Sequence, residues 1–88
     1  MPAPYRSTPV FDETTLPAAL RDEHSTKTGV WGVIRVIEGR VRLELLDDGT
    51  ETILTPDRPG CVLPEQRHRV EPLGAMRMRV EFYREPPS

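Results

Sequence analysis

The sequence predicts an all-β fold, a small sandwich or barrel built as a single domain. The chain has 88 residues, which is enough for one domain and one modest core. Short apolar segments alternate with clusters of Gly, Pro and Asp, and the chain contains 10 prolines and 6 glycines. Strands that recur at intervals of about ten residues between such turns are typical of small sandwiches and barrels.

The N-terminal part of the sequence gives a weaker indication of secondary structure. Residues 1–8 are predicted to be a flexible arm, residues 9–84 the folded domain, and residues 85–88 a C-terminal tail. The segment 15–21 (TLPAALR) can be read as a helical turn beginning near Pro17. We favour an extended conformation, because its apolar spacing is too short to sustain a helix.

The strongest strand is predicted over residues 30–38 (VWGVIRVIE), which are apolar on both faces and therefore expected to be covered on both sides. Gly39 allows a tight reversal, and residues 40–46 alternate between apolar and polar side chains. Asp47-Asp48-Gly49 is a hairpin signal, with residues 51–54 as the returning strand.

The second half of the chain continues the pattern. A short strand at residues 61–63 is followed by a corner at residues 64–67 and a strand at residues 68–71. The last strand, residues 75–83, places four apolar side chains on one face: Met76, Met78, Val80 and Phe82. Its opposite face carries Arg77, Arg79, Glu81 and Tyr83.

Charge and composition exclude several classes of function. The formal net charge of −2 argues against a nucleic-acid partner, which favours a basic surface. The cluster of Arg67, Arg69, Arg77 and Arg79 is interspersed with acids, so we expect solvated strand faces with cross-strand ion pairs. No apolar run suits a membrane span or a secretory signal. The single cysteine fits a reducing compartment, so we expect a cytoplasmic protein.

Common catalytic motifs are absent from the sequence. It contains no P-loop, no GxGxxG, no CxxC and no Gly-x-Ser-x-Gly turn. Cys61 lies within a short apolar strand, where a buried, unreactive thiol is the expected state.

The two histidines are the best candidates for a functional site. His24 follows Glu23, and Glu65 precedes His68 by three residues. Imidazole together with carboxylate suits a divalent metal such as zinc, iron or nickel. The alternative is that each histidine is a satisfied structural residue.

The order Gly60, Pro64, His68 resembles the second motif of cupins, and Gly39 matches the glycine that closes their first motif. More narrowly, the chain is similar to the TehB/YeaR-like cupin family from Pro9 to Arg84. The segments that carry the resemblance are PVFDETTLPAAL (9–20), EHSTKTGVWG (23–32), LTPDRPG (54–60), PEQRHRVEPLG (64–74) and VEFY (80–83).

The resemblance implies a compact cupin barrel, a homodimer, and an association with oxyanion or nitrosative stress in bacteria. It implies His68 as a metal ligand and His24 as a second ligand, with Glu65 as the third and Glu81 as its competitor. The glutamate of the general first motif falls at Gly32 in this chain. A complete site of three histidines and one glutamate is excluded, because the chain has only two histidines.

Three hypotheses follow. In the first, His24, His68 and a carboxylate hold a divalent metal that binds a small anion, and any turnover would use water or dioxygen activated at that metal. In the second, a metal-free module binds an oxyanion or a carboxylate. The residues expected to line the ligand site are Trp31, Arg69, Glu81 and Tyr83, although Trp31 also suits the core. In the third, the outer face of the 30–38 strand serves dimerisation.

Overall fold

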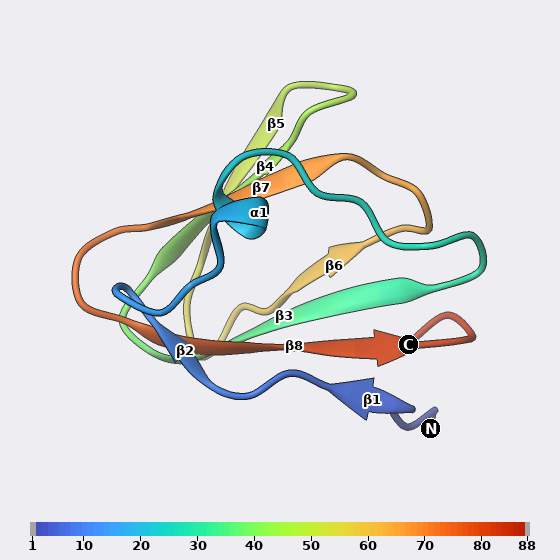
Figure 1. Cartoon of the computed structure of the whole chain (residues 1–88), viewed down its shortest axis with the longest axis horizontal. Coiled ribbons are helices and arrows are strands. Elements are labelled where there is room, and N and C mark those ends of the chain that lie inside the picture. Colours follow the sequence, from blue (N-terminus) through green and yellow to red (C-terminus); the bar gives the residue numbers. More distant parts are fainter. Residues whose placement is uncertain (1, 88) are drawn as a thin grey trace.

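The computed structural model describes residues 2–87, which form two antiparallel sheets and one short helix (Figure 1). The elements in chain order are β1 (Arg6–Ser7), β2 (Phe11–Asp12), α1 (Ala18–Arg21), β3 (Trp31–Glu38), β4 (Val41–Leu45), β5 (Thr50–Leu54), β6 (Gly60–Val62), β7 (His68–Pro72) and β8 (Arg77–Tyr83). The prediction of a small, mostly β domain is confirmed.

The two sheets differ in size and face each other (Figure 1). The larger sheet has the strand order β1-β8-β3-β6, and β2 pairs with another part of β8. The smaller sheet has the order β5-β4-β7. Each of the six strands predicted from Val30 onward is present, with bounds within two residues of those expected.

The core lies between the sheets and is built by alternation along the strands. The inward side chains of β3 include Ile34 and Val36, and those of β4 include Val41 and Leu43, all of them buried. The predicted apolar face of the last strand is confirmed: Met76, Met78 and Val80 are buried, and Phe82 packs against the same cluster. This alternation makes the opposite faces of both sheets the outer surfaces.

Gly39 makes the reversal expected from the sequence, and it also takes the chain from one sheet to the other. Its φ is +76°, a conformation that L side chains rarely adopt. A Cβ atom at this position would collide with the carbonyl oxygen of Ala75. Glycine is therefore required by the backbone conformation and by the packing.

The extended conformation favoured for residues 15–21 is wrong, because Ala18–Arg21 forms α1. Pro17 precedes this single turn with a φ of −58° and so supplies a preset dihedral angle at its start. Leu20 is buried in the core and anchors the turn. One helical turn is held by a single buried side chain, so it needs no apolar periodicity.

Cys61 is exposed, which corrects the expectation of a buried thiol. Its neighbours Gly60 and Val62 face the core, so strand alternation turns Cys61 outward. Desolvation by the surrounding chain still raises the pKa of the thiol. The protonated form is therefore favoured, which agrees with the predicted low reactivity.

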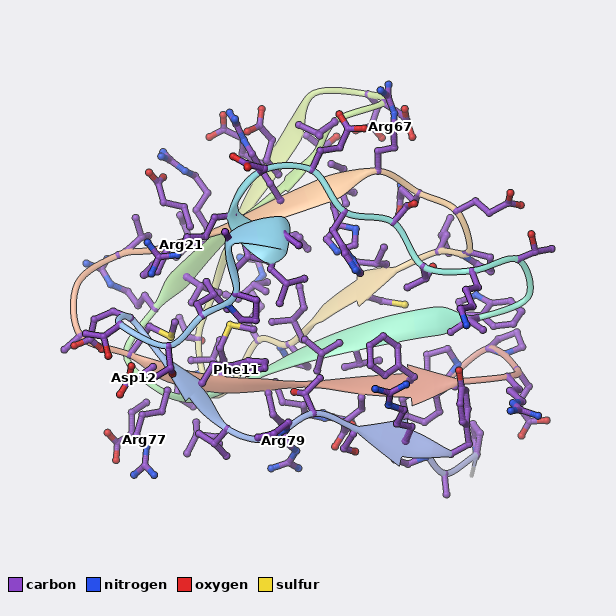
Figure 2. All side chains as sticks on the ribbon, in the orientation of Figure 1. Phe11, Asp12, Arg21, Arg67, Arg77 and Arg79 are labelled. Carbon is purple, nitrogen blue, oxygen red and sulfur yellow. The ribbon has the colours of Figure 1, made fainter. Side chains whose placement is uncertain are left out.

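Each arginine of the cluster forms an ion pair, but that of Arg79 is with Glu81 of its own strand and is not cross-strand as predicted. Arg69 pairs with Glu44 on the neighbouring strand of the smaller sheet, and Arg67 pairs with Asp47 beside the β4–β5 turn. Figure 2 shows Arg77 and Arg79 pointing away from the smaller sheet. Among residues 2–87, no helix is long and apolar enough to span a membrane.

Candidate functional site

His24 and His68 are brought together by the backbone. Each donates its backbone N–H to the carbonyl oxygen of the other, with both N···O distances at 2.8 Å. This isolated antiparallel bridge attaches the segment after α1 to β7. The two imidazole rings consequently meet edge to face, with their centroids 5.4 Å apart and their planes at 81°. The structure thus joins the two histidines that the sequence singled out.

His68 is buried, and its protonation state is defined by its contacts. Its Nδ1 lies 3.1 Å from the carbonyl oxygen of Gln66. Since a carbonyl oxygen can only accept, Nδ1 carries the proton and the neutral ring keeps a lone pair on Nε2. Burial lowers the pKa of His68, the Gln66 hydrogen bond opposes that effect, and His24 lowers the pKa further. The neutral ring is therefore favoured near pH 7.

His24 presents a different local environment. Its side chain is partly exposed, yet its Nδ1 is buried and has no hydrogen-bond partner among the described residues. A buried polar atom without a partner carries a desolvation cost of roughly 1–3 kcal/mol. Such atoms are rare in native folds and mark sites where a ligand, an ion or a water molecule completes the bonding.

A cavity of about 180 Å³ lies between the two sheets and includes both histidines in its wall. Residues from β2, α1, β3, β6 and β8 supply the rest of the lining, and most of them are apolar. They include Phe11, Leu20, Ile34, Val62, Val80 and Phe82. In Figure 1, α1 lies beside β7, and the segment after it runs past β7 before it reaches the start of β3.

A second, more polar cavity of about 290 Å³ adjoins the first. The two share four lining residues, Thr8, His24, Thr26 and Phe82. The second cavity also contains Arg6 from β1 and Lys27 from the loop after His24. Both cations are exposed, and neither forms an ion pair with another residue among 2–87. His24 therefore lies between the apolar cavity and the cationic opening, whereas His68 lines the apolar cavity alone.

The proposed third metal ligand does not lie with the histidines. Glu65 is exposed at the corner before β7, in a shallow depression with Lys27 and Arg67. Glu81 lies on the outer face of β8, where Arg35, Arg79 and Tyr83 occupy its oxygens. Among residues 2–87, no three His, Cys, Asp or Glu side chains gather closely enough to hold a metal ion. Two imidazoles are fewer than the three or four protein ligands of typical zinc sites.

Gly32 stands at the position where the resemblance noted above expects a glutamate. It lies on the inner face of β3 opposite Val62. A Cβ atom at Gly32 would lie 3.5 Å from Thr26 Cγ2 and 3.9 Å from Val62 Cβ, in ordinary van der Waals contact. A carboxylate carried from this position would project toward the cavity, and glycine leaves that space open.

The other predicted ligand-binding residues lie outside the cavity. Trp31 is half-buried on the outer face of β3, in a groove that also contains Cys61, Leu63 and Pro86. Arg69 is on the outer face of β7 and pairs with Glu44. Tyr83 is buried on the outer face of β8, where its hydroxyl donates to Glu81.

Several residues that line the cavities were not predicted as site residues from the sequence. Phe82 could have been predicted from the sequence, because strand alternation already placed its side chain on the inner face of the last strand. Thr26 is buried, and its hydroxyl donates to the carbonyl oxygen of Leu63 and accepts from the N–H of Glu65, so it fixes the corner that precedes His68. Arg6 and Thr8 fell in the predicted arm, where nothing in the local sequence pointed to a site.

Comparison with known proteins gives a consistent assignment. Residues 6–80 match the TehB-like domain family. In two strains of Haemophilus influenzae, a probable S-adenosyl-L-methionine-dependent methyltransferase TehB is 36% identical to this chain over 74 residues. The match covers 78% of this chain and 26% of the relative, so the chain spans about a quarter of that protein's length.

Two solved structures share the fold. The crystal structure of TehB from Haemophilus influenzae superposes with a TM-score of 0.81 at 34% identity, covering 91% of this chain and 30% of that one. A structure of a protein from Escherichia coli strain K12 superposes with a TM-score of 0.85, covering 94% of this chain and 90% of that one. Its 22% identity shows the fold alone.

Proposed function

The chain belongs to the TehB-like domain family, and we propose that it is a small-molecule-binding module whose site is the cavity beside His24 and His68. The observation that carries this proposal is that His24, whose buried Nδ1 has no hydrogen-bond partner among residues 2–87, lies with His68 in the wall of the cavity. A concave, mostly apolar site with a few convergent polar groups is typical of ligand binding. The methyl transfer named for the TehB relatives is not part of this proposal, because the chain spans only about a quarter of their length.

We also interpret the two sheets as a cupin-type barrel. The supporting features are the two opposed antiparallel sheets, the cavity between them, and a histidine from β7 in the cavity wall. The relation to the tellurite-resistance protein TehB supports a role in stress responses. The exposed, unpaired thiol of Cys61 suits a reducing compartment and supports a cytoplasmic location.

Binding is tested by following the backbone amide NMR signals during separate titrations with tellurite, nitrite and small carboxylates. We expect shifts at Thr26 and His68, and a weakened response in the His68→Gln variant. Arg69→Ala is the matched control, because Arg69 follows His68 on the opposite face of the same strand. Shifts confined to the outer faces, or an unchanged response in His68→Gln, would contradict the proposal. Trp31 fluorescence is a poor reporter, because Trp31 lies on the outer face.

A divalent metal is a second candidate ligand, and one observation favours it. Histidines that bind metals usually donate their other ring N–H to a carbonyl or carboxylate, as His68 Nδ1 does to Gln66. The two histidines would hold the ion, and water or a small anion would complete its coordination. We expect weak binding of Co²⁺, detected by its absorption spectrum and lost in both His24→Ala and His68→Ala. Equal Co²⁺ binding by either variant would exclude this site.

A further inference from the structure

We propose that the ligand of this cavity is a small organic carboxylate with an apolar body, such as an aromatic or branched-chain monocarboxylate. The inference rests on the proposed function and specifies its ligand. The family relation points toward an inorganic oxyanion, whereas the size, lining and charge of the cavity favour a molecule that is apolar at one end and anionic at the other.

The first argument is the size and lining of the inner cavity. Its volume is about 180 Å³, and a protein cavity of roughly 150 Å³ accommodates one benzene molecule. Aromatic and aliphatic side chains from the larger sheet and α1 form most of its wall, and the smaller sheet contributes His68. An inorganic oxyanion placed there would lose its hydration without gaining enough donors, which is unfavourable. An aromatic ring or a branched alkyl group would fill the space and bury apolar surface.

The second argument is the distribution of charge. The chain as a whole carries a formal charge of −2, yet no Asp or Glu lines either of the two adjoining cavities. The outer cavity contains Arg6 and Lys27. Charge complementarity therefore favours an anionic group at the opening.

The third argument is the orientation set by the histidine pair. His68 lines only the apolar cavity, and its Nδ1 is engaged by the carbonyl oxygen of Gln66. Arg6 and Lys27 line only the outer cavity, so a carboxylate is favoured toward that opening. Since the two cavities share His24, Thr26 and Phe82, one molecule can extend from the apolar interior to Arg6 and Lys27.

Isothermal titration calorimetry with benzoate and isovalerate tests the proposal. Benzamide serves as the neutral analogue of benzoate, acetate as the carboxylate without an apolar body, and tellurite as the inorganic oxyanion. We expect benzoate or isovalerate to bind with a Kd about tenfold lower than that of each of these three comparison ligands. Replacing Ala19 of the cavity wall, as in Ala19→Leu, should weaken binding because the larger side chain takes up space in the cavity.

Variants separate the two parts of the inference. The double variant Arg6→Ala/Lys27→Ala should raise the Kd of benzoate about tenfold and leave that of benzamide unchanged. The matched control is Arg58→Ala/Arg77→Ala, which removes two exposed cations that line neither cavity. Two results would overturn the assignment of an anionic group at the opening. One is benzamide binding as tightly as benzoate, and the other is an unchanged Kd of benzoate in Arg6→Ala/Lys27→Ala.

Two other outcomes distinguish this inference from the proposed function. If tellurite or acetate binds at the histidine pair as tightly as benzoate, the ligand does not need an apolar body. That result would overturn this inference, but the domain would still be a small-molecule-binding module. No heat and no amide shift with any of these probes would overturn both proposals.

Discussion

Arg35 on β3 and Glu81 on β8 form an ion pair across the outer face of the larger sheet, with 2.9 Å between Arg35 Nε and Glu81 Oε1. The hydroxyl of Tyr83 donates to the same oxygen at 2.9 Å, and Arg79 Nη2 lies 3.0 Å from the other. Burial alone would raise the pKa of Glu81, but these hydrogen bonds outweigh it and lower the pKa. Glu81 is therefore a buried, ionised carboxylate on the face away from the cavity.

Removing this carboxylate should destabilise the domain. Glu81→Ala leaves Tyr83 and two arginines without their acceptor, so we expect the free energy of unfolding to fall by about 2 kcal/mol. Urea denaturation measures the change. Glu71→Ala is the control, because its pair with Arg42 is exposed and should contribute much less. Equal losses of unfolding free energy in the two variants would show that the contacts of Glu81 contribute no more than an exposed ion pair.

Stability should fall on mild acidification because of His68. Its pKa is lowered in the folded state, while an unfolded histidine titrates near about 6.5. The unfolded chain then binds the proton first, so the free energy of unfolding is unaffected above about pH 6.5 and declines below it. Urea denaturation at several pH values should show a smaller decline for His68→Gln. Parallel curves for the two proteins would contradict this assignment.

Comparing Gly39→Ala with Gly49→Ala distinguishes the stability cost of backbone strain from that of a steric collision. Both have a positive φ, +76° and +72°. Gly49→Ala meets no atom within 4 Å and should cost about 1 kcal/mol of stability. Gly39→Ala adds a collision with the carbonyl of Ala75, so the loss should be clearly larger. Thermal unfolding measures both, and similar melting temperatures would show that the inter-sheet connection relaxes easily.

A carboxylate at position 32 should strengthen metal binding. Gly32→Glu would add a third ligand beside the two histidines, which is the number typical of catalytic zinc sites. We expect Zn²⁺ to raise the melting temperature of this variant more than that of the wild type. Ile37→Glu is the control, because Ile37 lies further along the same strand and is exposed. The same Zn²⁺ effect in both variants would count against a site at the histidine pair.

The homodimer expected from the sequence stays a prediction. Leu63 is 54% exposed and lines the outer groove with Trp31 and Val33. If a second copy covers this face, light scattering should give twice the mass of one chain, and Leu63→Glu should reduce it. If the wild-type protein is monomeric at high concentration, the prediction of a homodimer is wrong.

The strands were predictable because their pattern is local. Period-two alternation located β4 and β8 and already placed Glu81 on the face opposite Met78 and Val80. The apolar, β-branched composition located β3, and turn residues bounded the shorter strands. That alternation argues against Glu81 as a partner of His68, a conclusion that the sequence alone supported. Turn residues such as Gly39 and Gly49 marked the reversals for the same local reason.

The site was only partly predictable because it depends on contacts between distant segments. The identity of the two histidines suggested a site, but their bridge joins the segment after α1 to β7 and has no spacing signature. Thr26 and Arg6 reach the cavity through tertiary packing, which their neighbours in the sequence do not encode. The helical turn α1 was missed because four residues are too few for a periodic pattern.

The pairing of β1 with β8 bears on how this protein is prepared for study. The domain boundary expected from the sequence begins at residue 9, yet Tyr5, Arg6 and Thr8 line the outer cavity. A chain trimmed to that boundary would lose the strand at the edge of the larger sheet and one of the two cations at the opening. An affinity tag fused to the N-terminus would sit close to the same opening, so a C-terminal tag is the safer choice for binding measurements.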